Sequence, residues 1–265
     1  MRGSDLSRRE VHPRPFVMGI LNVTPDSFSD GGLRMDADAA VRYAFSMSDA
    51  GAEVIDVGAE STRPGFIPVS AEEEISRLIP VLECLSGSLD VPISVDTMKP
   101  EVARAALDAG ADIINDVNGF RGEGMFDVCS NSDVDIIISH MYGSYDGMHD
   151  SVMGDDYKQE IKTFLDDQIA IANDKGISDD RIIVDPGIGF GKTPEQNLSL
   201  SKDCSFLGKE HRVLIGVSRK RFIRQYYPDM DVDEATAIVS KMAVESGASI
   251  VRVHNVKATV NALRL

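Results

Sequence analysis

Polar and charged side chains follow each of eight short runs of β-branched residues in this chain. Carboxylates and amides can form hydrogen bonds with a polar ligand, and guanidinium and imidazole groups can bind an anion. Polar residues at the ends of so many runs could therefore carry the chemistry of the protein. The run-ending residues are Asn22, Asp56, Asp96, Asn115 with Asp116, His140, Asp185, Ser218, and Arg252 with His254.

The segments between these runs show the apolar spacing of helices, as crossover connections require. Eight strands that alternate with helices predict an α/β protein, a single (β/α)₈ barrel. Right-handed crossovers put every strand's carboxyl end on the same face, so residues far apart in sequence converge there. We expect the active site at the C-terminal rim of the strands, in a barrel of residues 16–265 behind an N-terminal extension of residues 1–15.

Several helix ends can be predicted from capping residues. Asp36 could cap the first helix, which Gly51 would end, and Pro100 suits the first position of the third helix. A later helix is expected after Asp233. Only residues 255–265 follow the eighth strand, so the last helix should be short.

Composition narrows the class of protein. A chain of 265 residues with 43% hydrophobic residues suits one barrel domain. A formal net charge of -16 argues against general binding to nucleic acid or to anionic membranes. The three cysteines show no CxxC spacing, and no apolar run is long enough for a signal peptide or a membrane helix. We expect a cytoplasmic protein with reduced thiols and no zinc site.

Each strand-terminal residue also has a simpler interpretation. An Asp or Asn after a strand is often only a helix cap or turn former, but eight coincidences weaken that interpretation. Asp185 opens a glycine-rich segment, DPGIGFGKT, which resembles the end of a phosphate-binding loop. Pro186 stands where that motif needs its first glycine, so a nucleotide site is not favoured.

A basic group, Ser-Arg-Lys-Arg at residues 218–221, follows the seventh strand. Cations at a helix N-terminus oppose the helix dipole, so three in succession indicate an anionic partner. Arg252 and His254 alternate along the end of the last strand and face the same side. Together these groups predict a local anion site, suited to phosphate or pyrophosphate, within an acidic protein.

Seven motifs in order resemble those of the dihydropteroate synthases, a family of pterin-binding TIM barrels, and the resemblance covers most of the chain from Phe16 to Val256. It implies condensation of 6-hydroxymethyl-7,8-dihydropterin pyrophosphate with p-aminobenzoate, which gives dihydropteroate and pyrophosphate in folate biosynthesis. The motifs are NVTPDSFSDGG at 22–32, DVGAESTRPG at 56–65, SVDT at 94–97, NDVNG at 115–119, DPGIGFGKT at 185–193, GVSRKRF at 216–222 and RVHNV at 252–256.

The resemblance also implies roles for individual residues. Asp96, Asn115, Asp185 and Lys220 would bind the pterin, and of these Asp96, Asp185 and Lys220 would be catalytic. Asn22, Arg252 and His254 would bind pyrophosphate, with Mg²⁺ at Asn22. Thr62, Arg63, Ser218 and Arg221 would lie beside p-aminobenzoate, and loops at 26–32 and 61–65 would close over the site. Family members are commonly homodimers, so a homodimer is expected here.

Three positions depart from the family pattern. Arg221 stands where many members have serine, the fifth loop reads HMYGSYDGMHD, and Asn255 replaces a common aspartate. Asn255 could be a helix cap, and Tyr142 could pack on the rim. A guanidinium at Arg221 could bind a carboxylate or phosphate, which raises the hypothesis of a larger acceptor such as a ribosylated, phosphorylated aminobenzene.

Two other functions are possible for a pterin-binding barrel. Methyltransferase domains that bind a methylated pterin resemble this barrel, but they generally lack the TPDSFSDGG and STRPG loops and the lysine of SRK, all present here. A barrel that binds pterin without catalysis would be expected to lose the pyrophosphate residues, yet Arg252 and His254 are present. The synthase interpretation is therefore preferred.

Overall fold

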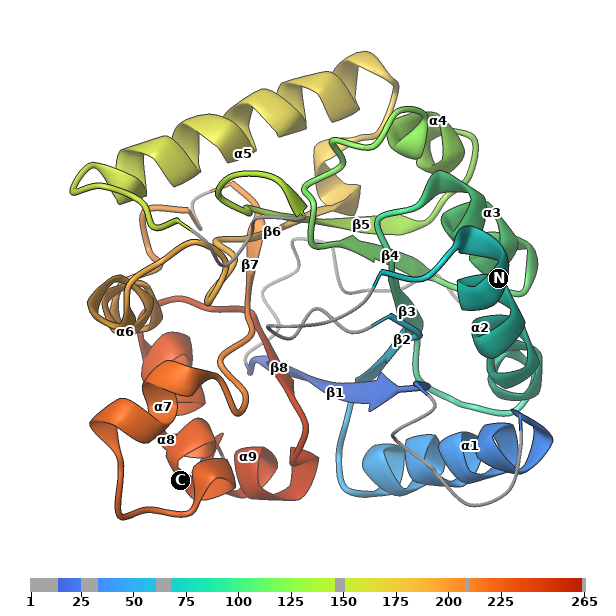
Figure 1. The fold of residues 1–265 in the computed structure, drawn as a ribbon, viewed down its shortest axis with the longest axis horizontal. Helices are drawn as coiled ribbons and strands as arrows, with labels where there is room; N and C mark the ends of the chain where they lie inside the picture. The colour runs from blue at the N-terminus through green and yellow to red at the C-terminus, as the bar shows by residue number, and fades with distance from the viewer. Residues whose placement is uncertain (1–13, 25–32, 61–67, 146–150, 208–209, 264–265) are drawn as a thin grey trace.

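The structure is a computed structural model that describes residues 14–24, 33–60, 68–145, 151–207 and 210–263. In these residues, eight parallel strands pair in sequence order and close into a barrel, β1 with β8. The predicted (β/α)₈ barrel is thus confirmed, and Figure 1 shows its strands in the centre with helices around them. The strands are β1 (Phe16–Asn22), β2 (Val54–Gly58), β3 (Ile93–Asp96), β4 (Ile113–Asp116), β5 (Asp135–Ser139), β6 (Ile182–Asp185), β7 (Arg212–Ile215) and β8 (Ile250–Val253).

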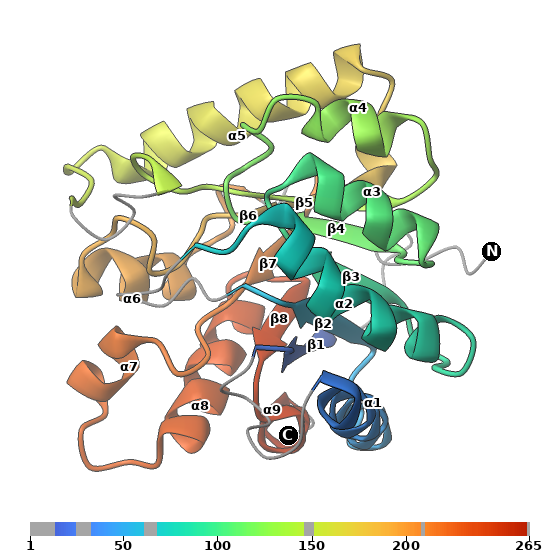
Figure 2. The same cartoon turned by 45° about the vertical axis from the view of Figure 1, so that its right-hand side comes forward.

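Helices lie on the outside of the barrel, and the C-terminal helix lies next to the first one in the ring (Figures 1 and 2). A short 3₁₀ turn, η3 (Asp179–Arg181), precedes β6. The α-helices of the described residues are α1 (Leu33–Asp49), α2 (Ala71–Ser86), α3 (Pro100–Asp108), α4 (Met125–Ser130), α5 (Tyr157–Asp174), α6 (Pro194–Lys202), α7 (Arg221–Tyr226), α8 (Val232–Glu245) and α9 (Val256–Leu263).

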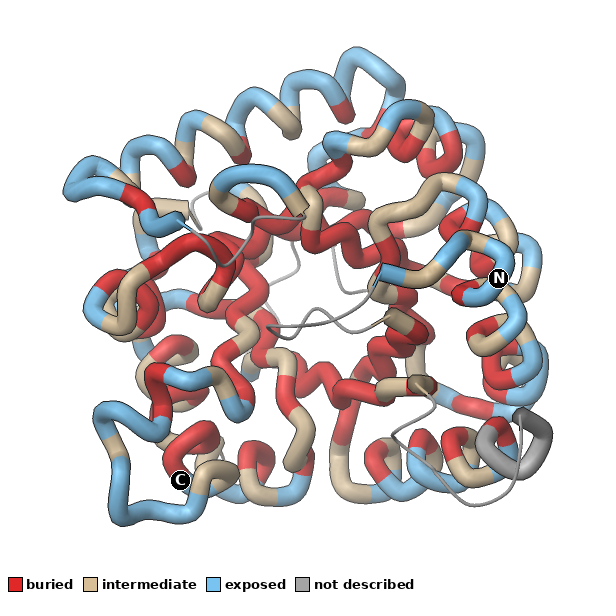
Figure 3. The backbone as a smooth tube through the Cα atoms, viewed as in Figure 1, coloured by how far each residue is buried: buried red, intermediate tan, exposed pale blue. Residues whose placement is uncertain are grey.

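Two apolar clusters hold the barrel together. The larger cluster lies between strands and helices, where each amphipathic helix buries its apolar stripe, and Figure 3 shows this as a buried inner ring with exposed outer helix faces. The smaller cluster fills the barrel interior with one side chain from most strands. Its members are Phe16, Met18, Val54, Ile113, Ile137, Ile183, Leu214 and Ile250.

Some helix ends differ from the prediction. Pro100 is the first residue of α3, as predicted, and Asn255 caps α9 by accepting a hydrogen bond from Ala258 N–H at 3.0 Å. Asp36 is not the cap of α1, because that helix already begins at Leu33, and an acidic residue is also favoured inside a first turn. Asp231, not Asp233, caps α8 and accepts from the backbone N–H groups of Asp233 and Glu234, which leaves the Asp233 side chain for an ion pair.

The described residues contain no helix long and apolar enough to cross a membrane. Cys84, Cys129 and Cys204 are free thiols, and the latter two are buried.

Candidate active site

A layer of polar side chains lies directly above the apolar interior of the barrel. Side chains alternate along a strand, so residues two positions after the interior cluster point into the same space. Hydrogen bonds join side chains on strands that are not neighbours, which places these side chains inside the barrel: Asn115 of β4 reaches Asp56 of β2 at 3.3 Å. We call this set the polar layer: Asp56, Ser94, Asp96, Asn115, Ser139, Asp185 and Arg252.

Arg252 links two carboxylates across this layer. Its Nε donates to Asp56 Oδ2 at 2.5 Å, and its Nη2 donates to Asp96 Oδ2 at 2.7 Å. Burial raises the pKa of Asp96 to about 7, although the Arg252 guanidinium opposes the shift. Burial disfavours the charge on Arg252 as well, but Asp56 and Asp96 outweigh it and raise the pKa of Arg252. Arg252 therefore stays charged, while Asp96 can change its charge near neutral pH.

Asn115 and Asp185 present hydrogen-bonding groups suited to a ring edge. Asn115 Oδ1 is buried and has no hydrogen-bond partner among the described residues. Asp185 accepts from Gly187 N–H at 2.7 Å and from the Ser139 hydroxyl at 3.3 Å. Burial raises the pKa of Asp185, with the positive charge of Lys220 opposing the shift. A buried acceptor without a donor is costly unless a ligand supplies one.

Lys220 and an apolar wall complete this side of the site. The Lys220 ammonium lies 4.6 Å from the centre of the Phe190 ring and donates to the Ile188 carbonyl. Burial lowers the pKa of Lys220 to about 8, while Asp185 opposes the shift. Phe190 belongs to a small apolar cluster with Val117 and Met141 at the ends of the strands. A flat ring can lie against this cluster while its edge meets the polar layer.

Ser218 and His254 form a pair beside Arg252. The His254 backbone N–H donates to Ser218 Oγ at 3.1 Å, and Ser218 Oγ lies 2.9 Å from His254 Nδ1. Ser218 can donate to Nδ1 when the ring proton is on Nε2, and it accepts from Nδ1–H when the proton is there. Asn22 ends the neighbouring strand β1, opposite Gly58 of β2. The three residues expected to bind pyrophosphate therefore come from adjacent strand ends.

The basic group at 218–221 divides between different roles. Arg219 makes a two-point ion pair with Asp233, at 2.7 and 2.8 Å, so an internal partner explains this cation. Lys220 interacts electrostatically with Asp185 and Asp96 of the polar layer. Arg221 is the first residue of α7, is exposed, and makes no hydrogen bond or ion pair with the described residues.

Thr62 and Arg63, expected beside p-aminobenzoate, lie outside the described residues, as do the loops at 26–32 and 61–65. The described residues on either side of 61–67 are tied together. Glu60 accepts from the Val69 N–H at 2.8 Å and from Lys99 Nζ at 3.0 Å.

The lysine of the DPGIGFGKT motif stabilises the loop that the motif forms. Lys192 is buried, and its Nζ donates to the Gly187 carbonyl at 2.9 Å and the Phe190 carbonyl at 3.0 Å. It also lies 3.0 Å from His140 Nδ1. Thr193 and Gln196 form a capping box at the start of α6. The Gly-Lys-Thr end of the motif therefore shapes the loop that carries Asp185 and Phe190.

Asp56 was predicted to end a strand at the rim but was assigned no role, and Lys192 was not among the predicted site residues. Asp56 is interior to β2, two positions after Val54 of the apolar interior, so the two-residue period of the strand was the signal that could have placed it in the site. The sequence around Lys192 does not indicate its role. Its partners are the carbonyls of Gly187 and Phe190 and the ring of His140, which come together only when the loop folds. Phe190 carried only a weak signal, as an aromatic residue among glycines.

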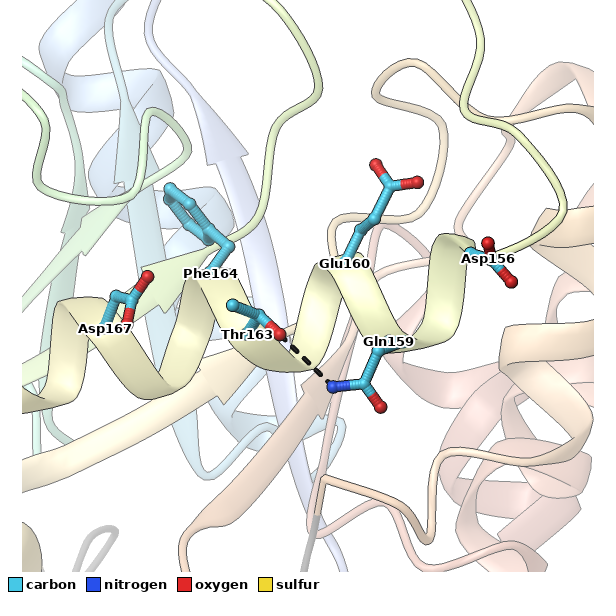
Figure 4. A pocket seen from close by; sticks show the side chains of 6 residues that line it. All are labelled: Asp156, Gln159, Glu160, Thr163, Phe164 and Asp167. Atoms are coloured by element: carbon cyan, nitrogen blue, oxygen red, sulfur yellow. Dashed lines mark hydrogen bonds between the residues drawn. The ribbon is translucent and has the colours of Figure 1, made fainter.

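A separate hollow lies on the outer surface, along α5 (Figure 4). Asp156, Glu160 and Asp167 line it together with Phe164, and Gln159 donates to Thr163 there at 3.2 Å. None of the strand-end residues lines this hollow. Its carboxylates would repel an anion, so it does not match the chemistry predicted from the sequence.

Comparison with known proteins assigns the family. A family model described as pterin binding enzyme matches residues 18–254. The dihydropteroate synthase of Escherichia coli strain K12 is 42% identical over 257 residues, which cover 95% of this chain and 90% of the relative. The chain belongs to the dihydropteroate synthase family.

Solved structures of dihydropteroate synthases match the barrel closely. The Xanthomonas albilineans dihydropteroate synthase with 4-aminobenzoic acid is 42% identical, with a TM-score of 0.88 over 95% of this chain and 91% of that one. The Burkholderia cenocepacia dihydropteroate synthase complexed with 7,8-dihydropteroate is 38% identical, with a TM-score of 0.84 over 96% and 90%. The predicted family and the enzyme class, a transferase that makes dihydropteroate, are confirmed, and the methyltransferase alternative is not favoured.

Proposed function

We propose that the polar layer binds 6-hydroxymethyl-7,8-dihydropterin pyrophosphate and that its methylene carbon is transferred to the amino group of p-aminobenzoate. The products are 7,8-dihydropteroate and pyrophosphate. The observation that carries this proposal is the buried Asn115 Oδ1, which has no partner among the described residues and lies in the same layer as Asp185 and the cation Arg252. Such a layer can hold a pterin edge and the anionic group attached to it at the same time.

The pterin is held by Asp185, Asn115, Lys220 and Asp96. Asp185 can accept hydrogen bonds from adjacent ring N–H groups, and Asn115 Oδ1 supplies a further acceptor. Lys220 supplies a donor from the side of Phe190, where the ring would lie. This assignment is supported by the burial of Asp185 and Asn115, since hydrogen bonds formed away from water discriminate strongly between ligands.

Bond breaking begins at the pyrophosphate. The C–O bond of the ester breaks, its electron pair leaves with the pyrophosphate, and the exocyclic methylene becomes cation-like. A carboxylate at Asp96 stabilises that positive charge as it develops. The amine nitrogen of p-aminobenzoate then forms the new C–N bond and releases a proton. The departing pyrophosphate is bound by three residues at the ends of adjacent strands, Arg252, His254 and Asn22.

Mg²⁺ fits this site as an ion whose ligands would come mainly from substrate phosphates and water. The described residues contain no group of three His, Cys, Asp or Glu side chains that could hold a metal ion. Asn22 offers one amide oxygen, and Mg²⁺ commonly keeps several waters and shares substrate phosphates. When bound, the ion would neutralise pyrophosphate charge and so assist its departure.

The acceptor is p-aminobenzoate, bound near Ser218 with Thr62, Arg63 and Arg221. The presence of 4-aminobenzoic acid in the related Xanthomonas albilineans structure supports this choice. The exposed Arg221 gives the hypothesis of a larger, phosphorylated acceptor a candidate binding group, but the relatives named dihydropteroate synthase do not favour that hypothesis.

A homodimer and a cytoplasmic location complete the proposal. The free thiols of Cys84, Cys129 and Cys204 suit a reducing compartment. Sedimentation of the purified protein tests the dimer: a mass of one chain at micromolar concentration would reject it.

Product formation tests the proposed reaction. The purified protein is incubated with the dihydropterin pyrophosphate, Mg²⁺ and p-aminobenzoate, while dihydropteroate is measured by mass and pyrophosphate by its release. Equal amounts of both products are expected, and their absence from a folded protein that has received all three components would reject the reaction.

A further inference from the structure

Asp56 is buried more completely than Asp96, the other carboxylate that Arg252 contacts. Its side chain is 0% exposed, whereas that of Asp96 is 15% exposed. It accepts from the Ser94 hydroxyl at 2.6 Å, from Arg252 Nε at 2.5 Å and from Asn115 Nδ2 at 3.3 Å. These three donors come from β3, β8 and β4, so Asp56 joins side chains from three other strands.

The contact with Asn115 sets which way its amide points. A carboxylate can only accept, so it favours the amide orientation that turns Nδ2 toward Asp56. The same orientation leaves Asn115 Oδ1 without a partner among the described residues. The face that Asn115 offers to a ligand therefore depends on the charge of Asp56.

The contact with Arg252 sets the plane of the guanidinium. Asp56 accepts from Nε while Asp96 accepts from Nη2, so two carboxylates fix the group at two points. Arg252 has five N–H donors in a fixed planar fork, and the remaining donors keep a defined direction. Without Asp56, Arg252 would keep only its contact with Asp96.

We propose that Asp56 is a positioning residue of the pterin site, which orients the Asn115 amide and the Arg252 guanidinium by accepting a hydrogen bond from each. The inference rests on the proposed function, because it takes the ligand of Asn115 to be a pterin. Asp56 acts through its neighbours, because its oxygens already accept from Ser94, Arg252 and Asn115.

Asp116 provides a matched control. It is also 0% exposed and lies at the end of β4, next to Asn115. Its two oxygens accept from the backbone N–H groups of Asn118 and Phe120, at 2.7 and 2.8 Å, so it shapes a turn. Asp116→Asn therefore replaces an equally buried carboxyl group that makes no hydrogen bond to Asn115 among the described residues.

The test is a double-mutant cycle of Asp56→Asn with Asn115→Ala. Dissociation constants are measured by calorimetry for 6-hydroxymethyl-7,8-dihydropterin, a probe without the anion that Arg252 would bind. Asp56→Asn should weaken binding about tenfold when Asn115 is present, the scale expected for a partner that orients a ligand-binding residue. It should weaken binding by less than about threefold in Asn115→Ala, because coupled residues are not additive. Asp116→Asn should leave the constant within about twofold.

Equal losses in both backgrounds, or no loss at all, would overturn the inference. If Asp56→Asn does not fold, Ser94→Ala replaces it in the same cycle, since it removes only the hydroxyl that donates to Asp56; additive effects there would also overturn the inference. Failure of the unmutated protein to bind the pterin would count against the proposed function instead, which separates the two outcomes.

Discussion

Two neighbouring regions differ in whether their buried polar groups have hydrogen-bond partners. In the glycine loop, the buried Lys192 has two backbone carbonyls and His140 Nδ1 within 3.0 Å, so each ammonium proton has an acceptor. In the polar layer, the buried Asn115 Oδ1 has no partner among the described residues. Buried polar groups with all their hydrogen bonds made inside the protein stabilise the backbone around them. A buried polar group without a partner is available to bind a ligand.

Removal of Asp185 tests this difference most strongly. Asp185→Ala should lower kcat/KM for the pterin substrate about 1000-fold, because it removes the acceptor for the ring N–H groups. It should not lower the melting temperature, since burial raises the pKa of Asp185 and the folded state therefore disfavours its charge. Steady-state kinetics and thermal unfolding check both parts. A large loss of stability with nearly normal kinetics would place Asp185 on the structural side of the comparison.

Lys192→Met should show the opposite pattern. The carbonyls of Gly187 and Phe190 lose their donor, so the free energy of unfolding should fall by about 2 kcal/mol. Chemical denaturation measures this loss, and kcat/KM should fall far less than in Asp185→Ala.

The pH dependence of stability provides a second check on Lys192. Burial lowers the pKa of Lys192 to about 7 from its usual 10.5, so the folded state binds fewer protons than the unfolded chain between these values. This lysine therefore makes the protein more stable as pH rises through that window. Lys192→Met should lack that part of the pH dependence, and identical curves for the two proteins would contradict the assignment.

Some residues of the site can be recognised from the sequence more easily than others. Asp96, Asn115 and Asp185 are visible because a polar residue that ends a β-branched run must lie at the rim of a barrel. Asp56 also follows a β-branched run, but its role can be recognised only when Ser94, Asn115 and Arg252 are known to surround it. Asp36 looks like a helix cap because capping and first-turn acidic residues resemble each other in sequence.

The pH profile of kcat/KM should sharpen the account of the polar layer. Burial raises the pKa of Asp96 to about 7, and Asp96 acts as an anion, so activity should rise with pH through about 7. Burial lowers the pKa of Lys220 to about 8, and Lys220 acts as a donor, so activity should fall above about 8. Asp96→Asn should lose the acid limb of the profile. An acid limb unchanged in that variant would assign it to another group.

Arg221→Ser should have the smallest effect. The side chain is exposed, and an exposed guanidinium contributes little to the binding of a carboxylate, so kcat/KM for p-aminobenzoate should fall by no more than about fivefold. The same variant tests the larger acceptor. If its ratio of kcat/KM for p-aminobenzoate and a ribosylated, phosphorylated aminobenzene equals that of the unmutated protein, Arg221 does not select the acceptor.

A crystal structure with 6-hydroxymethyl-7,8-dihydropterin pyrophosphate would test the central claim most directly. The account predicts a ring edge on Asp185 and Asn115 Oδ1, a ring face against Phe190, and the pyrophosphate on the side of Arg252 and His254. A ring bound elsewhere, with Asn115 Oδ1 still unpartnered, would contradict it.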